Sequence, residues 1–336
     1  MKENKERNQA FLSVHNLVVE YTSEGQVVHA VNGVSFELER GRTLGLVGET
    51  GAGKTTIAKA MMRILPNPPA KIRSGEVFLE GKDILSVSEH EMRKIRGRKI
   101  SMIFQDPMTA LNPVKTVADQ IAEVIKLHNA VSAAQATARA IQMLKMVGIA
   151  ENRAREYPHQ FSGGMKQRVV IAMALACSPE LLLADEPTTA LDVTIQAQVL
   201  DMIAKLKEDF NTAMIMITHD LGVVAEVCDD VAIVYAGEIV ERGSREDIFD
   251  HPMHPYTIGL FGALPDLDKD VDRLSPVEGM PPDPTDLPAG CSFHPRCPFA
   301  TEKCRKEHLE LKEYTPGHYY RCCKATVQEE AYGAIN

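Results

Sequence analysis

The segment from Thr43 to Leu65 constrains the fold of this chain more than any other. It reads TLGLVGETGAGKTTIAKAMMRIL, a short apolar run followed by a glycine-rich turn and a helical pattern. Gly48, Gly53, Lys54 and Thr55 have the spacing of a phosphate-binding loop. Glycines let backbone N–H groups close around a polyphosphate, and the helix that follows directs its positive end at the same point. The sequence therefore predicts a nucleotide site where a buried strand ends.

Two side chains of this loop have specific expected roles. We expect Lys54 to meet the β- and γ-phosphates, and the Thr55 hydroxyl to bind Mg²⁺. The nucleotide-binding residues predicted in this loop and the start of the helix are Gly48, Glu49, Thr50, Gly51, Ala52, Gly53, Lys54, Thr55 and Thr56.

A second apolar strand, LLLADEP from Leu181 to Pro187, ends in two carboxylates. Asp185 at the strand tip suits Mg²⁺, either directly or through water. Glu186 is next in the chain and is suited to polarise a water aimed at the γ-phosphate. Alone, such a pair usually belongs to a solvated loop, but together with a phosphate loop it favours a catalytic interpretation.

The remaining patterns alternate strands with helices. FLSVHNLVVEY and HAVNGVSFEL alternate apolar and polar residues, as half-buried antiparallel strands do. Two helical patterns, TVADQIAEVIKLH and SAAQATARAIQMLKMVG, lie between residues 116 and 148. Strand patterns return at ELLLAD and AMIMITHD after helical stretches. These features predict an α/β fold with a mainly parallel sheet that is interrupted by a helical block.

Composition narrows the class of protein. A chain of 336 residues suffices for one large core and a smaller appendage. Its net charge of −9 argues against broad binding to nucleic acid, and the basic run RKIRGRK, residues 93–99, is predicted to be a solvated loop. MKENKERNQA lacks the apolar core of a secretory signal, and the run VVIAMALAC is about half a bilayer span. We therefore expect a soluble protein, or one held at a membrane by partners.

A third motif, FSGGMKQR from Phe161 to Arg168, begins a helix with Ser162, Gly163 and Gly164. Alone it fits an ordinary capped helix start. Together with GETGAGKT, LLLADEP, TALD and ITHD it resembles the signature of the ATP-binding-cassette (ABC) ATPases along nearly the whole chain. The resemblance implies a RecA-like, mainly parallel core with an antiparallel β subdomain and an inserted helical subdomain. The implied ABC domain covers residues 11–264, with the helical subdomain at about 106–178.

The same resemblance assigns roles to four further residues. Gln105 in IFQDP resembles the glutamine that senses Mg²⁺ and the attacking water, and that relays to the membrane partner. His219 in ITHD resembles the histidine that contacts the γ-phosphate, although a hydrogen-bonded histidine after a strand is the structural alternative. Asp192 in TALD matches the loop that crosses the dimer interface. Tyr21 matches the aromatic residue against adenine, with a core tyrosine as the alternative.

Two residues depart from the commonest signature, Phe161 in place of leucine and Met165 in place of glutamine. Both leave Ser162 and Gly164 intact, which the resemblance implies bind the γ-phosphate of ATP held on another subunit. One nucleotide is then enclosed by the phosphate loop of one cassette and the signature helix of a second. ATP binding closes such a pair, and hydrolysis releases it.

Five of the seven cysteines fall in the last 46 residues, within a region where residues 275–298 hold seven prolines. Clustered cysteines in a chain of this kind suggest metal ligation rather than disulfides. Cys291, Cys297, Cys304 and Cys322 are separated by five, six and seventeen residues, without the Cys-x-x-Cys knuckle of structural zinc sites. Iron–sulfur clusters accept looser spacings. Both an iron–sulfur cluster and zinc remain open from the chemistry.

YPHQFSGGMKQR, ADEPTTALDVTIQAQ, HPYT and the terminal cysteines together resemble the ATPase subunits of dipeptide and oligopeptide importers, which carry a C-terminal extension. The resemblance implies a [4Fe–4S] cluster on Cys291, Cys297, Cys304 and Cys322, with Cys323 as the alternative fourth ligand and zinc as the alternative metal. The cluster would fold a small Cys-rich module over residues 265–336, too poor in apolar area to fold alone. Cys177 and Cys228 are expected in the cassette core.

This resemblance also implies the partners. The chain would hydrolyse ATP with Mg²⁺ at the cytoplasmic face of the cell membrane, as a peripheral subunit that energises uptake of dipeptides or oligopeptides. It would work with two transmembrane permease subunits, a second ABC ATPase subunit, either homologous or identical, and an external solute-binding protein, without nucleic acid. A groove near Gln105 to Thr116 is expected to receive the permease.

Three alternatives are kept. An importer of nickel or another small solute would use the same ATPase, since other subunits choose the substrate. A soluble iron–sulfur ABC protein acting on ribosomes or DNA is disfavoured by the single cassette, the lack of room for a long coiled-coil insertion, and the acidic charge. An inactive regulatory cassette is disfavoured by the intact Lys54, Asp185, Glu186 and His219.

Overall fold

The computed structural model describes residues 10–189, 191–262 and 277–323. The described residues form two compact units, the first with residues 10–12, 38–43, 83–189 and 191–217, the second with 13–37, 44–82, 218–262 and 277–323. Residues 265–276 and 324–336 of the predicted C-terminal module lie outside the described ranges. The predicted boundary between residues 264 and 265 therefore stays a prediction.

Three buried strands form the centre of the first unit: β6 (Ile100–Ile103), β7 (Leu181–Asp185) and β8 (Ala213–Thr218). β7 pairs in parallel with both neighbours, and its Leu181 lies opposite Ile100 on one side and Ala213 on the other. Every residue of the three strands is buried, as expected for a parallel sheet covered on both faces. The strands predicted at ELLLAD and AMIMITHD are confirmed. Because β6 and β7 are parallel, both lead into their following loops at the same edge.

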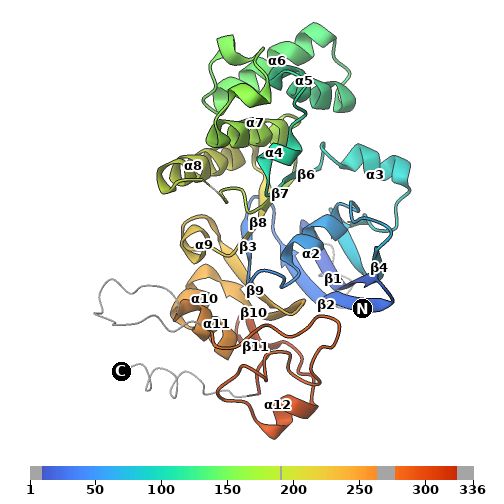
Figure 1. The fold of residues 1–336 in the computed structure, drawn as a ribbon, viewed down its shortest axis with the longest axis vertical. Coiled ribbons are helices and arrows are strands. Elements are labelled where there is room, and N and C mark those ends of the chain that lie inside the picture. The colour runs from blue at the N-terminus through green and yellow to red at the C-terminus, as the bar shows by residue number, and fades with distance from the viewer. Residues whose placement is uncertain (1–9, 190, 263–276, 324–336) are drawn as a thin grey trace. The chain divides into compact units, whose positions relative to one another are not determined.

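The predicted helical block is present in the first unit. It contains α4 (Pro107–Ala110), α5 (Val117–His128), α6 (Ala133–Met146), the short 3₁₀ turns η1 (Glu151–Arg153) and η2 (Pro158–Gln160), and α7 (Gly163–Leu175). Side-chain caps from Thr116, Ser132 and Ser162 begin α5, α6 and α7. Figure 1 shows α5 and α6 lying side by side. α8 (Val193–Phe210) follows β7.

One local prediction in this unit is wrong in part. The basic run at residues 93–99 was expected to be a loop, but α3 (Glu89–Ile95) includes Arg93 and Lys94. Ser88 caps this helix by accepting the N–H of Glu91, and the first turn is acidic. A cap, acidic residues at the start and basic residues at the end together stabilise a helix that charge density alone does not predict.

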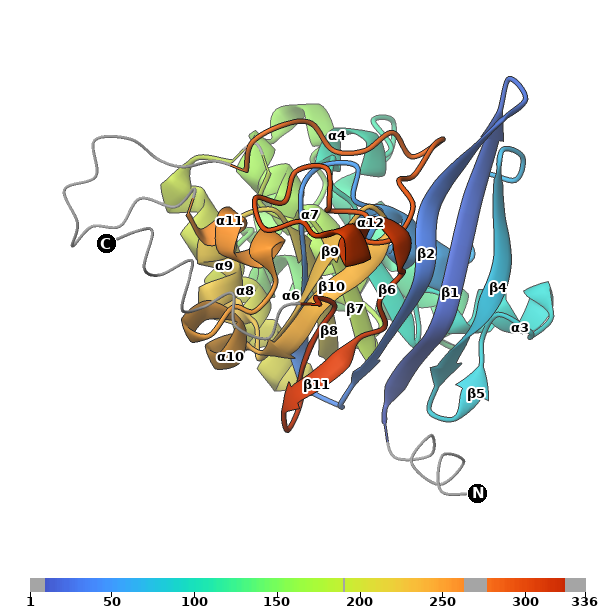
Figure 2. The same ribbon diagram turned by 90° about the horizontal axis from the view of Figure 1, so that it is seen from below.

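The second unit contains a sheet with the strand order β2–β1–β4–β5. Its strands are β1 (Leu12–Ser23), β2 (Gln26–Leu38), β4 (Ala70–Leu79) and the short β5 (Lys82–Asp83), and Figure 2 shows the three long strands side by side. β1 and β2 are the two strands predicted from alternating apolar residues, and both mix buried with partly exposed positions.

A further set of strands in the second unit leads to the phosphate loop. β3 (Thr43–Val47) is fully buried and parallel to β9 (Asp230–Tyr235), which is antiparallel to β10 (Glu238–Ser244). The accompanying helices are α2 (Lys54–Met61), α9 (Leu221–Val227), α10 (Arg245–Asp250) and α11 (Pro255–Phe261). The predicted order of strand, glycine loop and helix is confirmed by β3 and α2.

The C-terminal segment, residues 277–323, has little regular structure: α12 (Glu302–Lys306), β11 (Lys312–Thr315) and β12 (His318–Tyr320). β12 extends the sheet by pairing antiparallel with β10, and β11 pairs with β12. Two buried glutamates of β10 form hydrogen bonds with the segment. Glu241 accepts a hydrogen bond from His318 Nε2 at 2.8 Å, and Glu238 accepts one from Ser292 Oγ at 3.0 Å. The segment is thus attached through both backbone pairing and buried side-chain hydrogen bonds.

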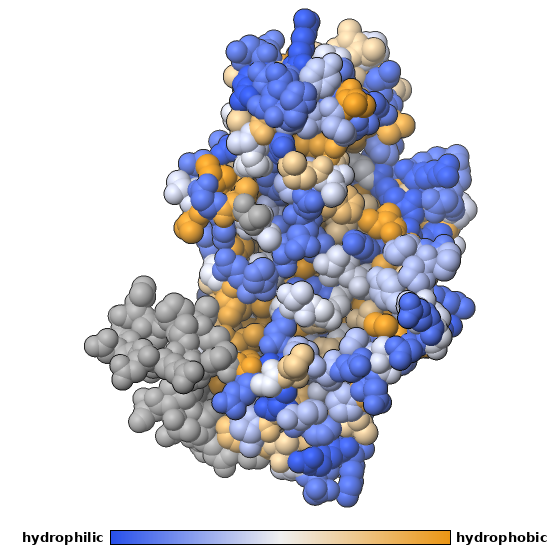
Figure 3. All heavy atoms as spheres, in the orientation of Figure 1, coloured by the Kyte–Doolittle hydropathy of each residue, from blue (hydrophilic) through white to orange (hydrophobic). Residues whose placement is uncertain are grey.

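On the face that Figure 3 shows, hydrophilic side chains predominate and hydrophobic ones occur in small groups. Among the helices in the described ranges, none is both long and apolar enough to span a bilayer.

Candidate nucleotide-binding and catalytic site

The phosphate loop connects the end of β3 at Val47 to the start of α2 at Lys54. Two of its glycines are required by close backbone approach. A Cβ on Gly48 would lie 2.1 Å from the carbonyl oxygen of Val234. A Cβ on Gly53, which has φ of +100°, would lie 2.3 Å from the carbonyl oxygen of Ala30. Side chains at these positions would therefore push the loop away from the strands that support it.

Lys54 is buried within the loop that it follows. Its Nζ donates hydrogen bonds to the carbonyl oxygens of Gly48, at 2.6 Å, and Glu49, at 2.9 Å. The ammonium group thus lies inside the turn formed by the loop. Tyr21 lies near the start of the same helix, with its hydroxyl 3.3 Å from Oγ1 of Thr56. The structure brings together Tyr21 and the loop, two predicted parts of a nucleotide site.

The predicted catalytic carboxylate lies where β7 ends. Asp185 is the last, buried residue of the strand, and Glu186 turns the chain with φ of 46°, in the left-handed region that few non-glycine residues adopt. Its N–H is satisfied by the carbonyl oxygen of Ile217 at 2.8 Å. Such backbone conformations require support from the surrounding structure and occur often at functional sites.

Two neutral donors hold the Glu186 carboxylate. Gln105 Nε2 donates to Oε2 at 2.7 Å, and Thr189 Oγ1 donates to the same oxygen at 2.9 Å. Gln105 follows β6 and Glu186 follows β7, so the parallel pairing of these strands explains why the two meet. The sequence identified Gln105 but missed Thr189, whose only signal was its place in DEPTTALD.

The signature motif opens α7. Ser162 caps the helix by accepting the N–H of Met165 at 3.4 Å, and the first turn, GGMK, carries no acidic residue. A Cβ on Gly164 would lie 2.7 Å from Cγ2 of Ile195, whereas a Cβ on Gly163 would meet nothing within 4 Å. The backbone N–H groups at this helix start can therefore receive an anion.

Two neighbouring side chains have structural contacts. Gln167 is buried in α7, and its Nε2 donates to the carbonyl oxygen of Pro187 at 2.6 Å. This bond ties the signature helix to the turn just after Glu186. Asp192 caps α8 by accepting the N–H of Ile195 at 2.9 Å, so it has a structural role besides the interface role predicted from the family. His219 precedes α9 and is exposed; its role stays a prediction.

The five C-terminal cysteines converge on one small pocket. It is lined by His254, Pro255, Cys291, Phe293, His294, Cys297, Phe299, Cys304, Leu309, Cys322 and Cys323. The sulfurs of Cys304 and Cys323 are 3.1 Å apart. Burial raises the pKa of the Cys297 thiol to about 11. Cys228 is buried elsewhere, in the core, and Cys177 accepts a hydrogen bond from Asn129.

These cysteines do not form a ready site for a single ion. In the part of the chain that the structure describes, no cysteine is in a disulfide, and no three Cys, His, Asp or Glu side chains are arranged to hold a metal ion. The described geometry therefore establishes the convergence of five thiols and leaves the predicted metal group as a proposal.

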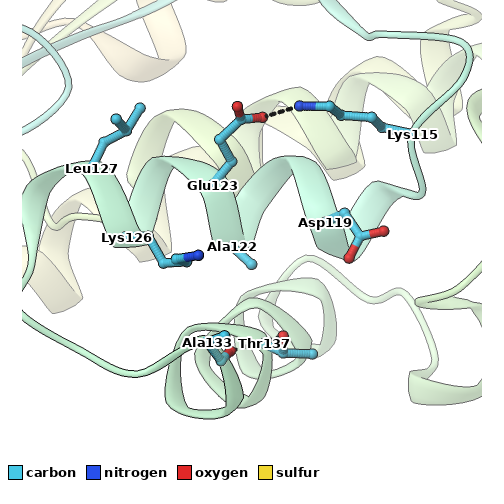
Figure 4. A pocket seen from close by; sticks show the side chains of 8 residues that line it. All are labelled: Lys115, Asp119, Ala122, Glu123, Lys126, Leu127, Ala133 and Thr137. Carbon is cyan, nitrogen blue, oxygen red and sulfur yellow. Dashed lines mark hydrogen bonds and ion pairs between the residues drawn. The ribbon is translucent and has the colours of Figure 1, made fainter.

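A groove of about 620 Å³ lies on the first unit between α5 and α6 (Figure 4). Figure 4 shows Lys115 and Glu123 joined by an ion pair along one wall, at 2.7 Å. The permease groove was expected near residues 105–116. The observed groove is formed by α5 and α6, which follow that region in the chain, and it includes only Lys115 of the expected range.

Comparison with known proteins decides the family. Residues 31–189 match the family model described as ABC transporter, and residues 240–304 match that described as oligopeptide/dipeptide transporter, C-terminal region. The chain is 50% identical to a probable peptide ABC transporter ATP-binding protein of Sinorhizobium fredii, over 94% of this chain and 95% of that one. It is 49% identical to the dipeptide transport ATP-binding protein DppD of Bacillus subtilis, over 93% of each. The chain belongs to the ABC transporter ATP-binding subunits of the oligopeptide/dipeptide family.

Solved ABC cassettes share the fold. A dimeric cassette, MJ0796, in a post-hydrolysis state bound to ADP and Pi, is 28% identical with a TM-score of 0.63, over 70% of this chain and 98% of that one. The cbiO1 cassette of Clostridium perfringens is 26% identical with a TM-score of 0.61, over 72% and 92% of the two chains. The prediction of an ABC ATPase fold is confirmed. The activity of this ABC subunit is ATP hydrolysis, for which ATP and Mg²⁺ are expected.

Proposed function

We propose that this ABC ATPase energises import of dipeptides or oligopeptides across the cytoplasmic membrane. The observation that carries the proposal is the Glu186 carboxylate, held by Gln105 at the carboxyl edge of buried parallel strands. It occurs in a chain that matches peptide transport ATP-binding proteins along nearly its full length. The first observation supports hydrolysis, and the second supports the class of substrate.

The proposed chemistry assigns one task to each group. Lys54 neutralises the β- and γ-phosphates, and Thr55, Gln105 and Asp185 would hold Mg²⁺, which would supply further charge neutralisation. Glu186 accepts a proton from the attacking water, which displaces ADP from the γ-phosphate. The hydrogen bonds from Gln105 and Thr189 fix the position of that carboxylate. His219 contacts the γ-phosphate.

We also propose that a second cassette completes the site. Ser162 and Gly163 at the start of α7 are exposed, and the helix start carries positive potential, both of which suit the γ-phosphate of a companion's ATP. Asp192 lies in the loop proposed to cross the interface. The similar cassette MJ0796 is described as dimeric. The companion is either a second copy of this chain or a homologous ATPase subunit.

Two permease subunits and an external solute-binding protein complete the proposed importer, with this chain peripheral on the cytoplasmic face. The groove between α5 and α6 is the proposed permease site (Figure 4). Leu127 lines the groove and is 74% exposed, and Val114, which precedes the lining residue Lys115 in the chain, is 79% exposed. A permease segment bound in the groove would cover the Leu127 side chain.

The C-terminal cysteines are proposed to bind a [4Fe–4S] cluster through Cys291, Cys297, Cys304 and either Cys322 or Cys323. Convergence of all five on one pocket supports this assignment, and both candidates for the fourth ligand line that pocket. When bound, such a cluster links distant parts of a loop-rich segment by thiolate bonds. Anaerobically purified protein should contain iron and absorb at about 400 nm; stoichiometric zinc without iron would overturn the proposal.

The transport proposal has a direct test. The chain is captured from detergent-solubilised membranes, the permease and second ATPase that accompany it are identified, and the complex is reconstituted in proteoliposomes with its binding protein. ATP-dependent uptake of a labelled dipeptide or oligopeptide, abolished by Glu186→Gln, is expected. Uptake of nickel with no peptide uptake would instead support the small-solute alternative, and recovery with ribosomes in place of a permease would overturn both.

A further inference from the structure

An arginine of the C-terminal segment forms an ion pair with the phosphate loop. Arg296 donates from its two terminal nitrogens to the Glu49 carboxylate, to Oε2 at 2.7 Å and to Oε1 at 3.0 Å. The two residues are 247 positions apart in the chain, and both belong to the second unit. The Arg296 side chain is only 4% exposed and that of Glu49 is 28% exposed. The pair is therefore a shielded, two-pronged ion pair, the geometry in which arginine binds carboxylate best.

Arg296 is itself held rigidly. Its Nε donates to the carbonyl oxygen of Glu278 at 2.9 Å, and a terminal nitrogen donates to that of Val277 at 3.0 Å. The guanidinium carbon lies 5.8 Å from the ring centre of Tyr235. Nearly all the donors of the guanidinium group are thus used, so its orientation toward Glu49 is fixed before any nucleotide arrives.

A second contact holds the backbone of the same loop residue. The N–H of Glu49 donates to the hydroxyl of buried Tyr256 at 3.0 Å. The ring of Tyr256 packs against Tyr235 at 4.5 Å and Phe293 at 5.4 Å between centres. Since Phe293 and Arg296 both lie in the C-terminal segment, this segment supports both the side chain and, through packing, the backbone partner of Glu49.

The proline-rich part of the segment follows the same side of the loop. The N–H of His29 donates to the carbonyl oxygen of Pro284 at 2.8 Å. A cavity of about 210 Å³ separates this stretch from the loop, and it is lined by His29, Glu49, Thr50, Gly51, Ala52, Tyr235, Ala236, Gly237, Pro281, Pro282, Pro284 and Leu287. The Arg296–Glu49 pair is a direct charge contact between the segment and the loop.

We propose that Arg296 is a positioning residue for ATP, which holds the phosphate loop in its binding shape and cancels the charge of Glu49. Glu49 affects the site in two further ways. Its carbonyl oxygen accepts a hydrogen bond from Lys54 Nζ. Its carboxylate places a negative charge in a loop that must bind a polyphosphate. Without Arg296 that charge repels the nucleotide, and the loop loses order that binding must restore. The C-terminal segment is then a part of the nucleotide site.

The test uses a double variant to separate the effect of the Glu49 charge on ATP binding from an effect on folding. Arg296→Gln, Glu49→Gln and the double variant are prepared in the full chain, with Arg305→Gln as the matched control, since Arg305 is an exposed arginine of the same segment with one long ion pair to Glu302. MgATP affinity is measured with a fluorescent ATP analogue and competition by ATP, beside thermal unfolding. KM and kcat are measured in the assembled transporter.

Arg296→Gln should weaken MgATP binding by about tenfold, which corresponds to about 1.4 kcal/mol of binding free energy. In the transporter, KM should rise while kcat changes by less than about twofold. The double variant should regain most of the affinity because the unpaired carboxylate is gone. Arg305→Gln should bind as the wild type does. Wild-type affinity in Arg296→Gln, or a double variant no better than that single one, would overturn the proposal.

Folding failure has a separate answer. If Arg296→Gln is not recovered as folded protein, Arg296→Lys retains the positive charge but replaces the fork by a single ammonium group. We expect it to bind MgATP about threefold more weakly at an unchanged unfolding temperature. Wild-type affinity in this variant would overturn the role of the fork.

Discussion

Replacing Glu241 by glutamine should weaken the attachment of the C-terminal segment to β10. Glu241 is fully buried and accepts three hydrogen bonds: from the N–H of Met253 at 2.7 Å, the N–H of His254 at 2.8 Å, and His318 Nε2 at 2.8 Å. Met253 and His318 share Oε1, while His254 uses Oε2. A glutamine can place its oxygen toward only one of these two groups of donors, so its NH₂ must face another donor.

The expected loss follows from these three bonds. A buried hydrogen bond to a charged group contributes about 1.5–3 kcal/mol, and a donor left without an acceptor costs about 1–3 kcal/mol. In Glu241→Gln one donor is left facing an amide and the other bonds lose charge assistance, so we expect about 3–5 kcal/mol of lost stability, typical of breaking a buried pair. At an unfolding entropy of about 2.1 cal/mol/K per residue, this lowers the Tm of a 336-residue chain by about 4–7 °C.

Differential scanning calorimetry measures this shift, and hydrogen exchange locates it. The backbone amides of β12 should exchange faster in the variant, since Tyr320 lies opposite Glu241 in the ladder. Glu310→Gln is the control, because Glu310 is an exposed glutamate of the same segment and should shift the Tm by less than about 1 °C. Equal melting of the two variants, with β12 protected in both, would refute the reasoning.

Three further substitutions test the site. Glu186→Gln removes the proton acceptor and should slow steady-state ATP hydrolysis by about 10²–10⁴-fold while ATP binding survives; wild-type turnover would exclude Glu186 as the base. Gly53→Ala places a Cβ 2.3 Å from the carbonyl oxygen of Ala30 and should abolish measurable nucleotide binding by the purified chain, whereas normal binding would show that the loop tolerates displacement. Ser162→Ala removes the cap that accepts the N–H of Met165 and should lower the free energy of unfolding by about 1 kcal/mol. The same variant should leave ATP binding by the single chain intact but reduce hydrolysis in the assembled transporter by more than about tenfold; unchanged hydrolysis would separate Ser162 from catalysis.

The sequence predicted most of the elements that carry the site because their signals are local. The spacing of Gly48, Gly53 and Lys54 depends only on how a backbone turns between a strand and a helix, and the structure has that arrangement. The contact between Gln105 and Glu186 was only partly foreseeable: the strand before Glu186 was predicted, but β6, which precedes Gln105, was not, and the parallel pairing of β6 with β7 is what brings the two side chains together. The helix over Arg93 and its neighbours was missed because a dense run of charge hid the Ser88 cap.

Contacts that join distant segments could not be read in the same way. Nothing near Arg296 indicates that it pairs with Glu49, because the partner is chosen by how the C-terminal segment lies on the second unit. The choice between Cys322 and Cys323 is similar. Adjacent residues point differently according to local backbone, so spacing alone does not decide which sulfur approaches Cys304, and the structure places that of Cys323 at 3.1 Å.

The hydrogen bond from Gln167 to Pro187 has a consequence for paired cassettes. One end of this short mechanical linkage is the helix proposed to touch the neighbour's ATP, and the other end is the residue directly after Glu186. A shift of α7 on contact with the neighbour's ATP would therefore move the backbone next to Glu186, the general base of this cassette. Contact with the neighbour's ATP would in this way affect the residue that activates water in this cassette's own site.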